Sequence, residues 1–474
     1  MSNSTCNKSF CSNYMLLNPE DAGFADVVKI LFSGDISKRK FIDCSDGTHE
    51  PLGRRWIIFI SILAQKFLQA AAKPLAGFGY GVEYWLNLLS ANGGFCGLIT
   101  NSFKGKIVEL DSTSASFRSF LGHVDKRLEL DPTIGSGDER YYAALSVMAS
   151  KASYENKECV ESIVKDHWKM DFVGFYDFHN DYQGKATTQA FIMDDKKDTI
   201  IVAFRGTEPF DADAWSSDVD LSWYEINSEI GKIHGGFLKA LGLLQSQGWP
   251  LEQDPNQPET AYYAIRKLLT QLVQKNPNAK FIVTGHSLGG ALAVLFPAVL
   301  GLHKEYSFLL DRLEGVYTFG QPRVGDGIFG EYMNKLIEKH SFTCIRFVYS
   351  YDLVPRLPYD DSTLLFKHFG TCIYYNSLYQ GKVVDEEPDK NYFSIIWMIP
   401  KFLNAGWELI RSFCIKYMKG SDYEEGGLLR MFRVIGLMVA GVSAHCTQDY
   451  VNCMRLGSSD VFLSLNGQKM LKMQ

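Results

Sequence analysis

The segment GHSLG around Ser287 constrains the fold more than any other feature of the sequence. It follows residues 280–284, KFIVT, whose β-branched and aromatic side chains predict a buried strand, and it precedes residues 290–300, whose alanines and leucines predict a helix. A serine flanked by glycines at such a junction is typical of a sharp strand-to-helix turn that exposes the serine hydroxyl. We therefore expect Ser287 to be a catalytic nucleophile.

The residues next to Ser287 have predicted roles of their own. Gly285 and Gly289 permit a strained turn in which a Cβ would clash, and His286 completes that turn. The backbone N–H of Leu288 opens the predicted helix, so it would face an oxyanion that forms beside the serine. We expect these residues to form the nucleophile turn and one half of an oxyanion hole.

A serine hydroxyl is a poor nucleophile near neutral pH, so it needs a base, and the base needs an acid that orients it. In proteins whose nucleophile lies on this kind of turn, the acid follows the serine along the chain and the histidine follows the acid. Asp352 comes directly after the strand-like run 344–350, at the end of a strand where parallel sheets place functional groups. His445 lies in a loop of small residues between an apolar run and a predicted helix. We predict Asp352 as the acid and His445 as the base.

Other residues in the same part of the chain are alternatives. Asp360 and Asp361 lie farther along, in a polar turn that is typical of solvated carboxylates. His368 lies in a strand-like run, where a histidine more often makes a structural hydrogen bond than a catalytic one.

The chain from about residue 138 to residue 474 predicts one α/β domain with a mostly parallel central sheet. Its strand-like runs are nearly continuous in apolar residues, which suits strands buried on both faces, and each precedes a turn or a helix. The clearest of these runs are residues 199–204, 280–284, 315–319 and 344–350. Residues 1–55 are mixed and polar, and they predict no function.

Residues 56–100 are strongly apolar. The first 17 of them are short of the roughly 20 that a spanning helix needs, and they include Lys66, which is costly inside a bilayer. The polar side chains recur every four residues on one narrow helical stripe: Ser61, Gln65, Gln69 and Lys73. Pro74 and the glycines after it predict a break, so we expect a helical hairpin that lies in or dips into one lipid leaflet. A helix pair packed on the catalytic domain is the alternative.

The segments around the three predicted catalytic residues, GHSLGGALA, VYSYDLVPRLP and SAHCTQDYV, resemble the class 3 lipases. AFRGTEP, AWSSDVDLSW and IHGGFLKAL, between residues 203 and 241, carry the same resemblance, which covers roughly residues 138–460. With the apolar zone included, the chain is most similar to the oil-body-associated triacylglycerol lipases of plants. The resemblance implies an α/β-hydrolase fold.

The resemblance also implies roles for two further segments. Thr207 matches the second oxyanion donor, although the same residue could merely cap a turn. Phe210–Ser222 matches the lid of the family, a short helix that opens on lipid. Trp215 in the lid and Trp223 just after it are suited to insertion into lipid, but two core tryptophans would look the same in sequence.

One departure from the small secreted members of the family is the distance of 93 residues between Asp352 and His445. The extra length includes a predicted amphipathic insertion near residues 392–442. Within it, residues 394–419 have a helical stripe of polar side chains, with tryptophan, phenylalanine and isoleucine on the remaining surface. Docking on lipid and packing on the domain are both consistent with this pattern.

The predicted triad indicates a serine hydrolase that works through an acyl-enzyme with no metal or organic cofactor, and the apolar segments argue for water-insoluble acyl esters. The resemblance implies triacylglycerol as the substrate. A phospholipase A1 or a galactolipid acyl hydrolase with the same triad is the alternative, because nothing in the sequence separates these head groups. An inactive lipid-surface scaffold and a soluble carboxylesterase are more distant alternatives.

Composition and the N-terminal residues bear on partners and location. A net charge of −6 without a long basic run argues against a nucleic-acid partner. The N-terminus lacks the basic start and apolar core of a signal peptide, and the ten cysteines lack metal-site spacing, so we expect a protein that is not secreted. With the resemblance, this predicts the cytosolic side of a lipid droplet (oil body) or of the endoplasmic reticulum membrane. The sequence does not indicate whether the chain forms a homo-oligomer.

Overall fold

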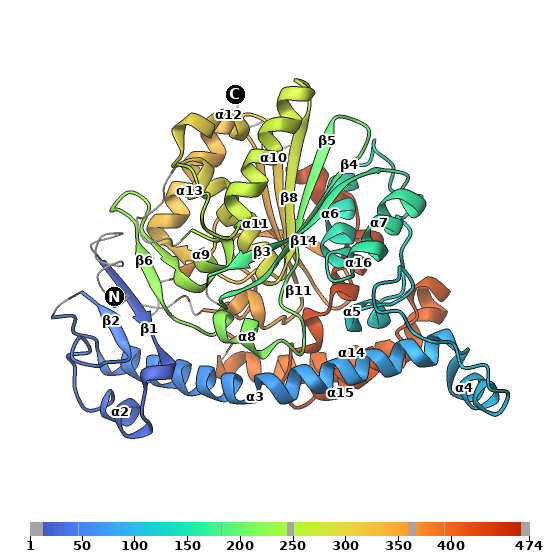
Figure 1. Ribbon diagram of the computed structural model, residues 1–474, viewed down its shortest axis with the longest axis horizontal. Coiled ribbons are helices and arrows are strands. Elements are labelled where there is room, and N and C mark those ends of the chain that lie inside the picture. Colours follow the sequence, from blue (N-terminus) through green and yellow to red (C-terminus); the bar gives the residue numbers. More distant parts are fainter. Residues whose placement is uncertain are drawn as a thin grey trace.

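The computed structural model describes residues 13–45, 47–181, 183–243, 251–358, 360, 366–392 and 394–465. A twisted sheet with the strand order β14-β13-β11-β9-β8-β5-β4-β3 forms the centre of the molecule (Figure 1). Its strands, in chain order, are β3 (Asp171–Asn180), β4 (Lys185–Asp194), β5 (Thr199–Phe204), β8 (Lys280–His286), β9 (Leu313–Phe319), β11 (Thr343–Tyr349), β13 (Thr371–Tyr375) and β14 (Gly381–Val384).

The sheet is parallel in its middle and antiparallel at both edges. Neighbouring strands from β5 to β13 run parallel, whereas β3, β4 and β14 pair antiparallel. This confirms the predicted mostly parallel sheet and each of the four predicted strands. Phe204 pairs with Gly285, and His286 pairs with Phe319. The parallel strands β5, β8 and β9 therefore end level with one another, and the segments that follow them leave the sheet at the same end.

Two helical layers cover the sheet, and each encloses an apolar core. The core on one face includes α9 (Gly235–Leu241), α10 (Ala261–Lys275), α11 (Leu288–Leu300), α12 (Ser307–Leu310) and α13 (Gly327–His340). The core on the other face includes α6 (Tyr141–Ala152), α7 (Lys157–Ser162) and α16 (Thr447–Leu456). Because both faces are covered, the middle strands are apolar on both sides, as their sequences predict.

A second, smaller sheet joins the N-terminal residues to the domain. Its order is β12-β10-β7-β6-β1-β2, and β1 pairs with β6 so that Met15 lies opposite Trp223. The strands are β1 (Asn13–Leu17), β2 (Ile42–Cys44), β6 (Trp223–Glu225), β7 (Lys232–His234), β10 (Gly325–Asp326) and β12 (Phe366–Lys367).

The remaining helices lie largely along one side of the molecule, the lower side in Figure 1. They are α2 (Phe24–Lys29), α3 (Leu52–Ala91), α4 (Gly94–Phe103), α5 (Phe120–Val124), α8 (Ala212–Asp218), α14 (Ile395–Lys419) and α15 (Gly427–Gly436).

The predicted break at Pro74 is wrong, because α3 is one continuous helix and the turn to the next helix lies at Asn92–Gly93. Pro74 removes one backbone hydrogen bond, but it and Ala70 are exposed, so the carbonyl that loses its partner is open to solvent. The apolar zone therefore forms a long helix followed by the short α4 instead of a hairpin centred on the proline.

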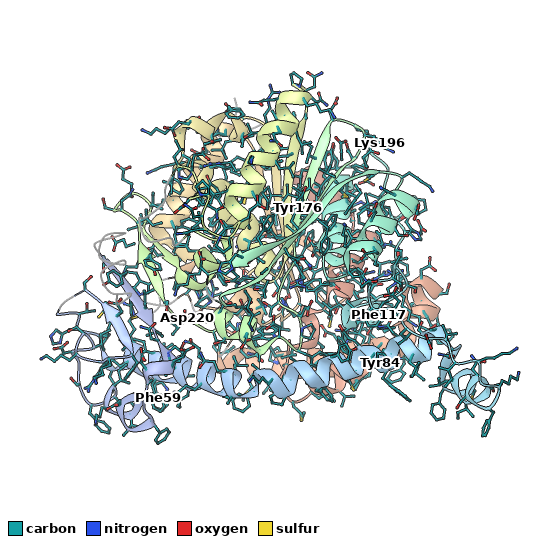
Figure 2. The ribbon with its side chains drawn as sticks, in the orientation of Figure 1. Phe59, Tyr84, Phe117, Tyr176, Lys196 and Asp220 are labelled. Atoms are coloured by element: carbon teal, nitrogen blue, oxygen red, sulfur yellow. The ribbon has the colours of Figure 1, made fainter. Side chains whose placement is uncertain are left out.

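Both halves of α3 are fixed to the domain through polar side chains, which explains why the helix continues past Pro74. In the first half, Ser61 donates to the carbonyl of Val219 at 2.7 Å, and the Gln65 amide lies 3.4 Å from Asp220, which faces α3 from the domain side (Figure 2). In the second half, Glu83 accepts from the N–H of Phe120 at 2.7 Å. The first half of the predicted polar stripe, Ser61 and Gln65, thus turns inward, whereas Gln69 is half-buried and Lys73 is exposed. Apolar side chains such as Trp56, Ile60 and Phe67 are exposed.

Candidate active site

Ser287 sits at the strained turn that the sequence predicts between β8 and α11. Its backbone has φ 58° and ψ −129°, in the left-handed half of conformational space, which is costly for a residue with a side chain. A Cβ on Gly285 would lie 2.1 Å from the backbone carbon of Gly289, and one on Gly289 would lie 2.3 Å from the carbonyl oxygen of Phe204. Both glycines are therefore required by close backbone approach.

The structure brings Ser287, His445 and Asp352 together. Nε2 of His445 lies 2.8 Å from the hydroxyl of Ser287, and Nδ1 of His445 lies 2.8 Å and 3.0 Å from the two carboxylate oxygens of Asp352. A carboxylate on one ring nitrogen fixes the proton there and leaves the other nitrogen free to accept the serine proton. The arrangement can therefore activate the hydroxyl for attack on an acyl carbon.

Asp352 lies in the loop after β11, where it is completely buried and accepts hydrogen bonds from two donors besides His445. The Val354 N–H donates to it at 2.9 Å, and the Tyr450 hydroxyl donates at 2.5 Å from α16. The buried guanidinium of Arg356 donates to the backbone carbonyls of Ser350 and Asp352. These contacts fix the carboxylate toward His445, and neither Tyr450 nor Arg356 was predicted from the sequence.

His286, which the sequence places in the predicted nucleophile turn, holds the chain around His445. Its Nε2 donates to the carbonyl of His445 at 2.9 Å, so its Nδ1 accepts from the Tyr154 hydroxyl at 2.8 Å. Burial lowers the pKa of His286 well below its usual value, and the neighbouring His445 lowers it further. His286 is therefore neutral, which this pair of hydrogen bonds requires.

Thr207 and Leu288 lie at the same pocket, at the ends of β5 and β8. The amide of Leu288 is in the first turn of α11, where N–H groups have no partner within the helix. The Thr207 hydroxyl donates to Asp218 at 2.9 Å. Burial raises the pKa of Asp218 to about 7, although the hydrogen bond from Thr207 lowers it.

Helix α8 and the residue before it contribute to the lining of this pocket. Asp211 and Ala214 line it together with Leu288, and Ser287 is only 2% exposed. α8 packs against α3, and Phe210, just before α8, packs edge-on against Phe78 of α3. Of the two tryptophans considered for insertion into lipid, Trp223 is buried in the core beside the smaller sheet, whereas Trp215 is half-buried.

The alternative acid and base residues have other contacts. His368 is half-buried and donates from Nε2 to the carbonyl of Pro355 at 2.7 Å, and burial of its ring lowers its pKa well below the usual value. Asp360 forms an ion pair with Lys390 at 3.0 Å. Asp361 lies outside the described residues.

Gly320 is a further residue of the site that was not predicted from the sequence. It follows β9 with φ +61°, and a Cβ there would lie 2.9 Å from Cε1 of His445 and 3.0 Å from Asp352.

Among the described residues, no group of histidine, cysteine and acidic side chains is arranged to hold a metal ion.

Comparison with known proteins places this site in a family. Residues 201–362 match the family described as lipase (class 3). The chain is 41% identical to the triacylglycerol lipase OBL1 of Nicotiana tabacum over 94% of this chain and 95% of the relative, and 40% identical to OBL1 of Arabidopsis thaliana over 96% and 97%. Among solved structures, the Rhizomucor miehei lipase in its propeptide complex is 24% identical over 51% of this chain and 69% of that chain, with a TM-score of 0.37. The near-complete match to the plant lipases confirms the resemblance, and the chain belongs to the class 3 lipase family.

Proposed function

We propose that the protein hydrolyses the acyl esters of triacylglycerols, with Ser287, His445 and Asp352 as its catalytic triad. Membership of the class 3 lipases supports ester hydrolysis, and plant relatives named triacylglycerol lipases support the substrate. The observation that carries the proposal is the unbroken hydrogen-bonded chain from the Ser287 hydroxyl through His445 to Asp352.

The reaction follows from this chain of contacts. Ser287 Oγ attacks the ester carbon as its proton passes to Nε2 of His445, and Asp352 stabilises the imidazolium. The backbone N–H groups of Leu288 and Thr207 stabilise the oxyanion. His445 then gives the proton to the leaving glyceride oxygen, which leaves an acyl-enzyme. Water, deprotonated by His445, cleaves the acyl-enzyme to a fatty acid and restores Ser287.

The proposed place of action is a lipid surface, which α3 contacts with its outer side. Helix α3 is long and apolar enough to cross a membrane by length and composition, yet its polar side chains are used to bind the domain. This favours a helix that lies along the lipid surface rather than across a bilayer. We propose the oil-body surface on its cytosolic side, with the endoplasmic reticulum membrane as the alternative.

The test is fatty-acid release from emulsified triolein, with phosphatidylcholine and galactolipid vesicles in parallel. Asp352→Asn and Ser287→Ala are the active-site variants, and Asp360→Asn is the matched control because that carboxylate is paired with Lys390 away from the triad. We expect release from triolein by the wild type and by Asp360→Asn. Removal of a triad member lowers turnover by about 10⁴-fold or more.

Each result has a distinct meaning. Release from the phospholipid or galactolipid alone would retain the triad and change the substrate. Unchanged release by Ser287→Ala would refute the proposed nucleophile. No release from any substrate by folded wild-type protein would refute the enzyme assignment and favour the inactive scaffold.

A further inference from the structure

Helix α14 reverses the usual amphipathic arrangement of a surface helix. Its polar stripe points into the protein, with Glu408, Arg411 and Ser412 each 3% exposed or less. Its opposite side has large apolar side chains spaced mostly three or four residues apart, which we call the outer face: Ile396, Ile399, Leu403, Ile410, Phe413 and Tyr417. Three of them, Ile396, Leu403 and Tyr417, are 84%, 70% and 81% exposed.

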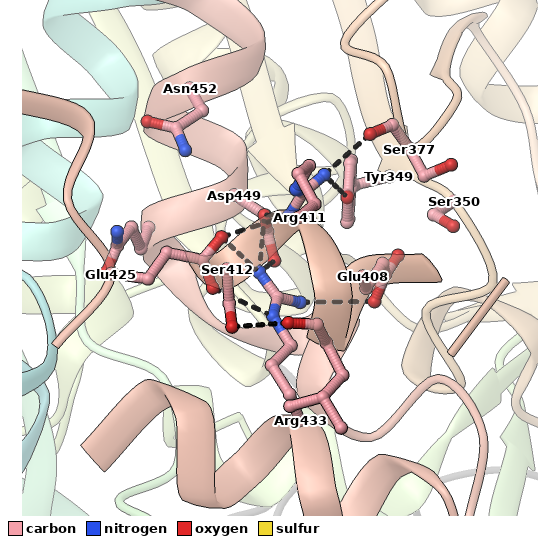
Figure 3. Close-up of polar contacts among 12 residues, drawn as sticks. Tyr349, Ser350, Ser377, Glu408, Arg411, Ser412, Glu425, Arg433, Asp449 and Asn452 are labelled. Atoms are coloured by element: carbon pink, nitrogen blue, oxygen red, sulfur yellow. Dashed lines mark hydrogen bonds and ion pairs between the residues drawn. The ribbon is translucent and has the colours of Figure 1, made fainter. Parts of the chain in front are cut away.

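A buried network of charges holds α14 in this orientation (Figure 3). Arg433 of α15 forms ion pairs with Glu408 of α14 at 3.1 Å, with Glu425 at 3.1 Å and with Asp449 of α16 at 2.8 Å. Arg411 of α14 pairs with the same Glu425 and Asp449, at 3.2 Å and 3.0 Å.

Hydrogen bonds extend this network to the central sheet. Arg411 donates to the Tyr349 hydroxyl at the end of β11 and to the carbonyl of Ser377, both at 2.6 Å. Asn404 of α14 donates to the Ser350 hydroxyl at 2.8 Å. The inward side of α14 is therefore committed to specific partners, so the helix cannot turn its apolar side inward without breaking these bonds.

Helix α15 packs against α14 and also has exposed apolar side chains. Met431, Val434 and Met438, on α15 and just after it, are each more than half exposed. Leu429 of α15 shares an apolar cluster with Val82 and Leu86 of α3. α14 and α15 lie on the same lower side of the molecule as α3, whose outer side chains project away from the domain (Figures 1 and 2).

We propose that the outer face of α14, with the exposed side of α15, is a second lipid-docking surface beside α3. A helix with large exposed apolar side chains along its whole length is unusual on a soluble monomer, and large exposed apolar patches mark interfaces. A lipid surface fits better than a protein groove because the exposed side chains are aliphatic and aromatic along the whole length of α14. This docking proposal rests on the proposed function in one respect only, which is that the surface bound by α14 and α15 is lipid.

The test changes two residues of the outer face in the full-length protein, Leu403→Glu with Ile410→Glu. The matched control is Phe308→Glu with Ile328→Glu, which adds the same charge at apolar side chains 39% and 42% exposed. These residues belong to α12 and α13, which lie in the upper part of Figure 1, whereas α14 lies along the bottom. Binding is measured by flotation with triolein emulsions coated with phosphatidylcholine. Hydrolysis of p-nitrophenyl butyrate, a soluble ester, reports on the active site.

We expect the outer-face variant to bind the emulsion on the order of tenfold or more weakly, because two aliphatic side chains no longer enter the lipid. The control should bind like the wild type, and both should hydrolyse the soluble ester at the wild-type rate. Equal binding by all three proteins would overturn the proposal, as would an equal loss in the control. Conversion of a dimer to a monomer with unchanged lipid binding would also overturn it, and would identify the face as an interface between copies.

The binding measurement is independent of the proposed substrate. If the wild type fails to hydrolyse triolein but the outer-face variant still loses binding, the docking surface stands and the proposed function fails. If the wild type hydrolyses triolein but the variant binds the emulsion unchanged, the proposed function stands and the docking surface fails.

Discussion

Replacing Arg433 by methionine tests whether the buried charges hold α14 and α15 on the domain. Arg433 is 1% exposed and forms ion pairs with Glu408, Glu425 and Asp449. Burial by itself lowers the pKa of Arg433, but these carboxylates raise it well above its usual value, so the side chain is charged. With Arg411, the group has three negative and two positive charges, and the substitution changes its net charge from −1 to −2.

Removal of one partner from a buried ion pair costs about 3–5 kcal/mol, because the charges that remain cannot be solvated. We expect Arg433→Met to lower the unfolding free energy by about that amount, measured by urea unfolding. Adding Glu408→Gln returns the net charge of the group to −1, so the double variant should recover at least about 1 kcal/mol. A loss below about 1 kcal/mol for the single variant, or a double variant less stable than the single one, would refute the reasoning.

Three further predictions concern the active site and its cover. Gly79→Ala places a Cβ 2.6 Å from that of Phe210, so it should displace the segment before α8 and raise soluble-ester hydrolysis measured without lipid; an unchanged rate would contradict this. Asp218 has a pKa of about 7 in the folded protein, above its usual value near 4, so the folded state holds an extra proton between these values and stability falls as pH rises through them. Asp218→Asn should remove this contribution, about 1.4 kcal/mol per pH unit, seen as a flatter dependence of urea unfolding on pH than in the wild type. Gly320→Ala introduces a Cβ 2.9 Å from His445 at a positive φ, so soluble-ester turnover should fall at least about tenfold while the circular dichroism spectrum is retained.

The central sheet and the candidate triad could be predicted because local sequence identifies both. The strands before Ser287 and Asp352 are nearly continuous apolar runs, and glycines flank Ser287, so each side chain could be assigned to a strand end without knowledge of tertiary contacts. Only two histidines follow Asp352 in the chain, His368 and His445, so the base could be one of these two. Tyr450 and Gly320 lacked such signals, because their closeness to Asp352 and His445 arises only when β9, β11 and α16 are assembled.

The orientation of the amphipathic helices could not be predicted in the same way. Periodicity in α3 and α14 separates a polar from an apolar side, but it does not say which side turns inward. The usual rule turns the apolar side inward, yet Gln65 and Arg411 are buried while Phe67 and Leu403 are exposed. The break expected at Pro74 is absent although the proline removes one backbone hydrogen bond, because Ala70, whose carbonyl loses its partner, is exposed to solvent.

The segment before α8 packs against helices that also have exposed apolar sides. Phe210, at the start of the segment over the pocket, packs against Phe78 of α3 and against Phe120 of α5, with ring centroids 5.7 Å and 5.0 Å apart. Phe120 in turn packs against Phe432 of α15 at 5.7 Å. A shift of α3 or α15 therefore alters the packing of Phe210 directly. The docking proposed for the apolar outer sides of α3 and α15 would therefore reach the segment before α8 through this aromatic cluster.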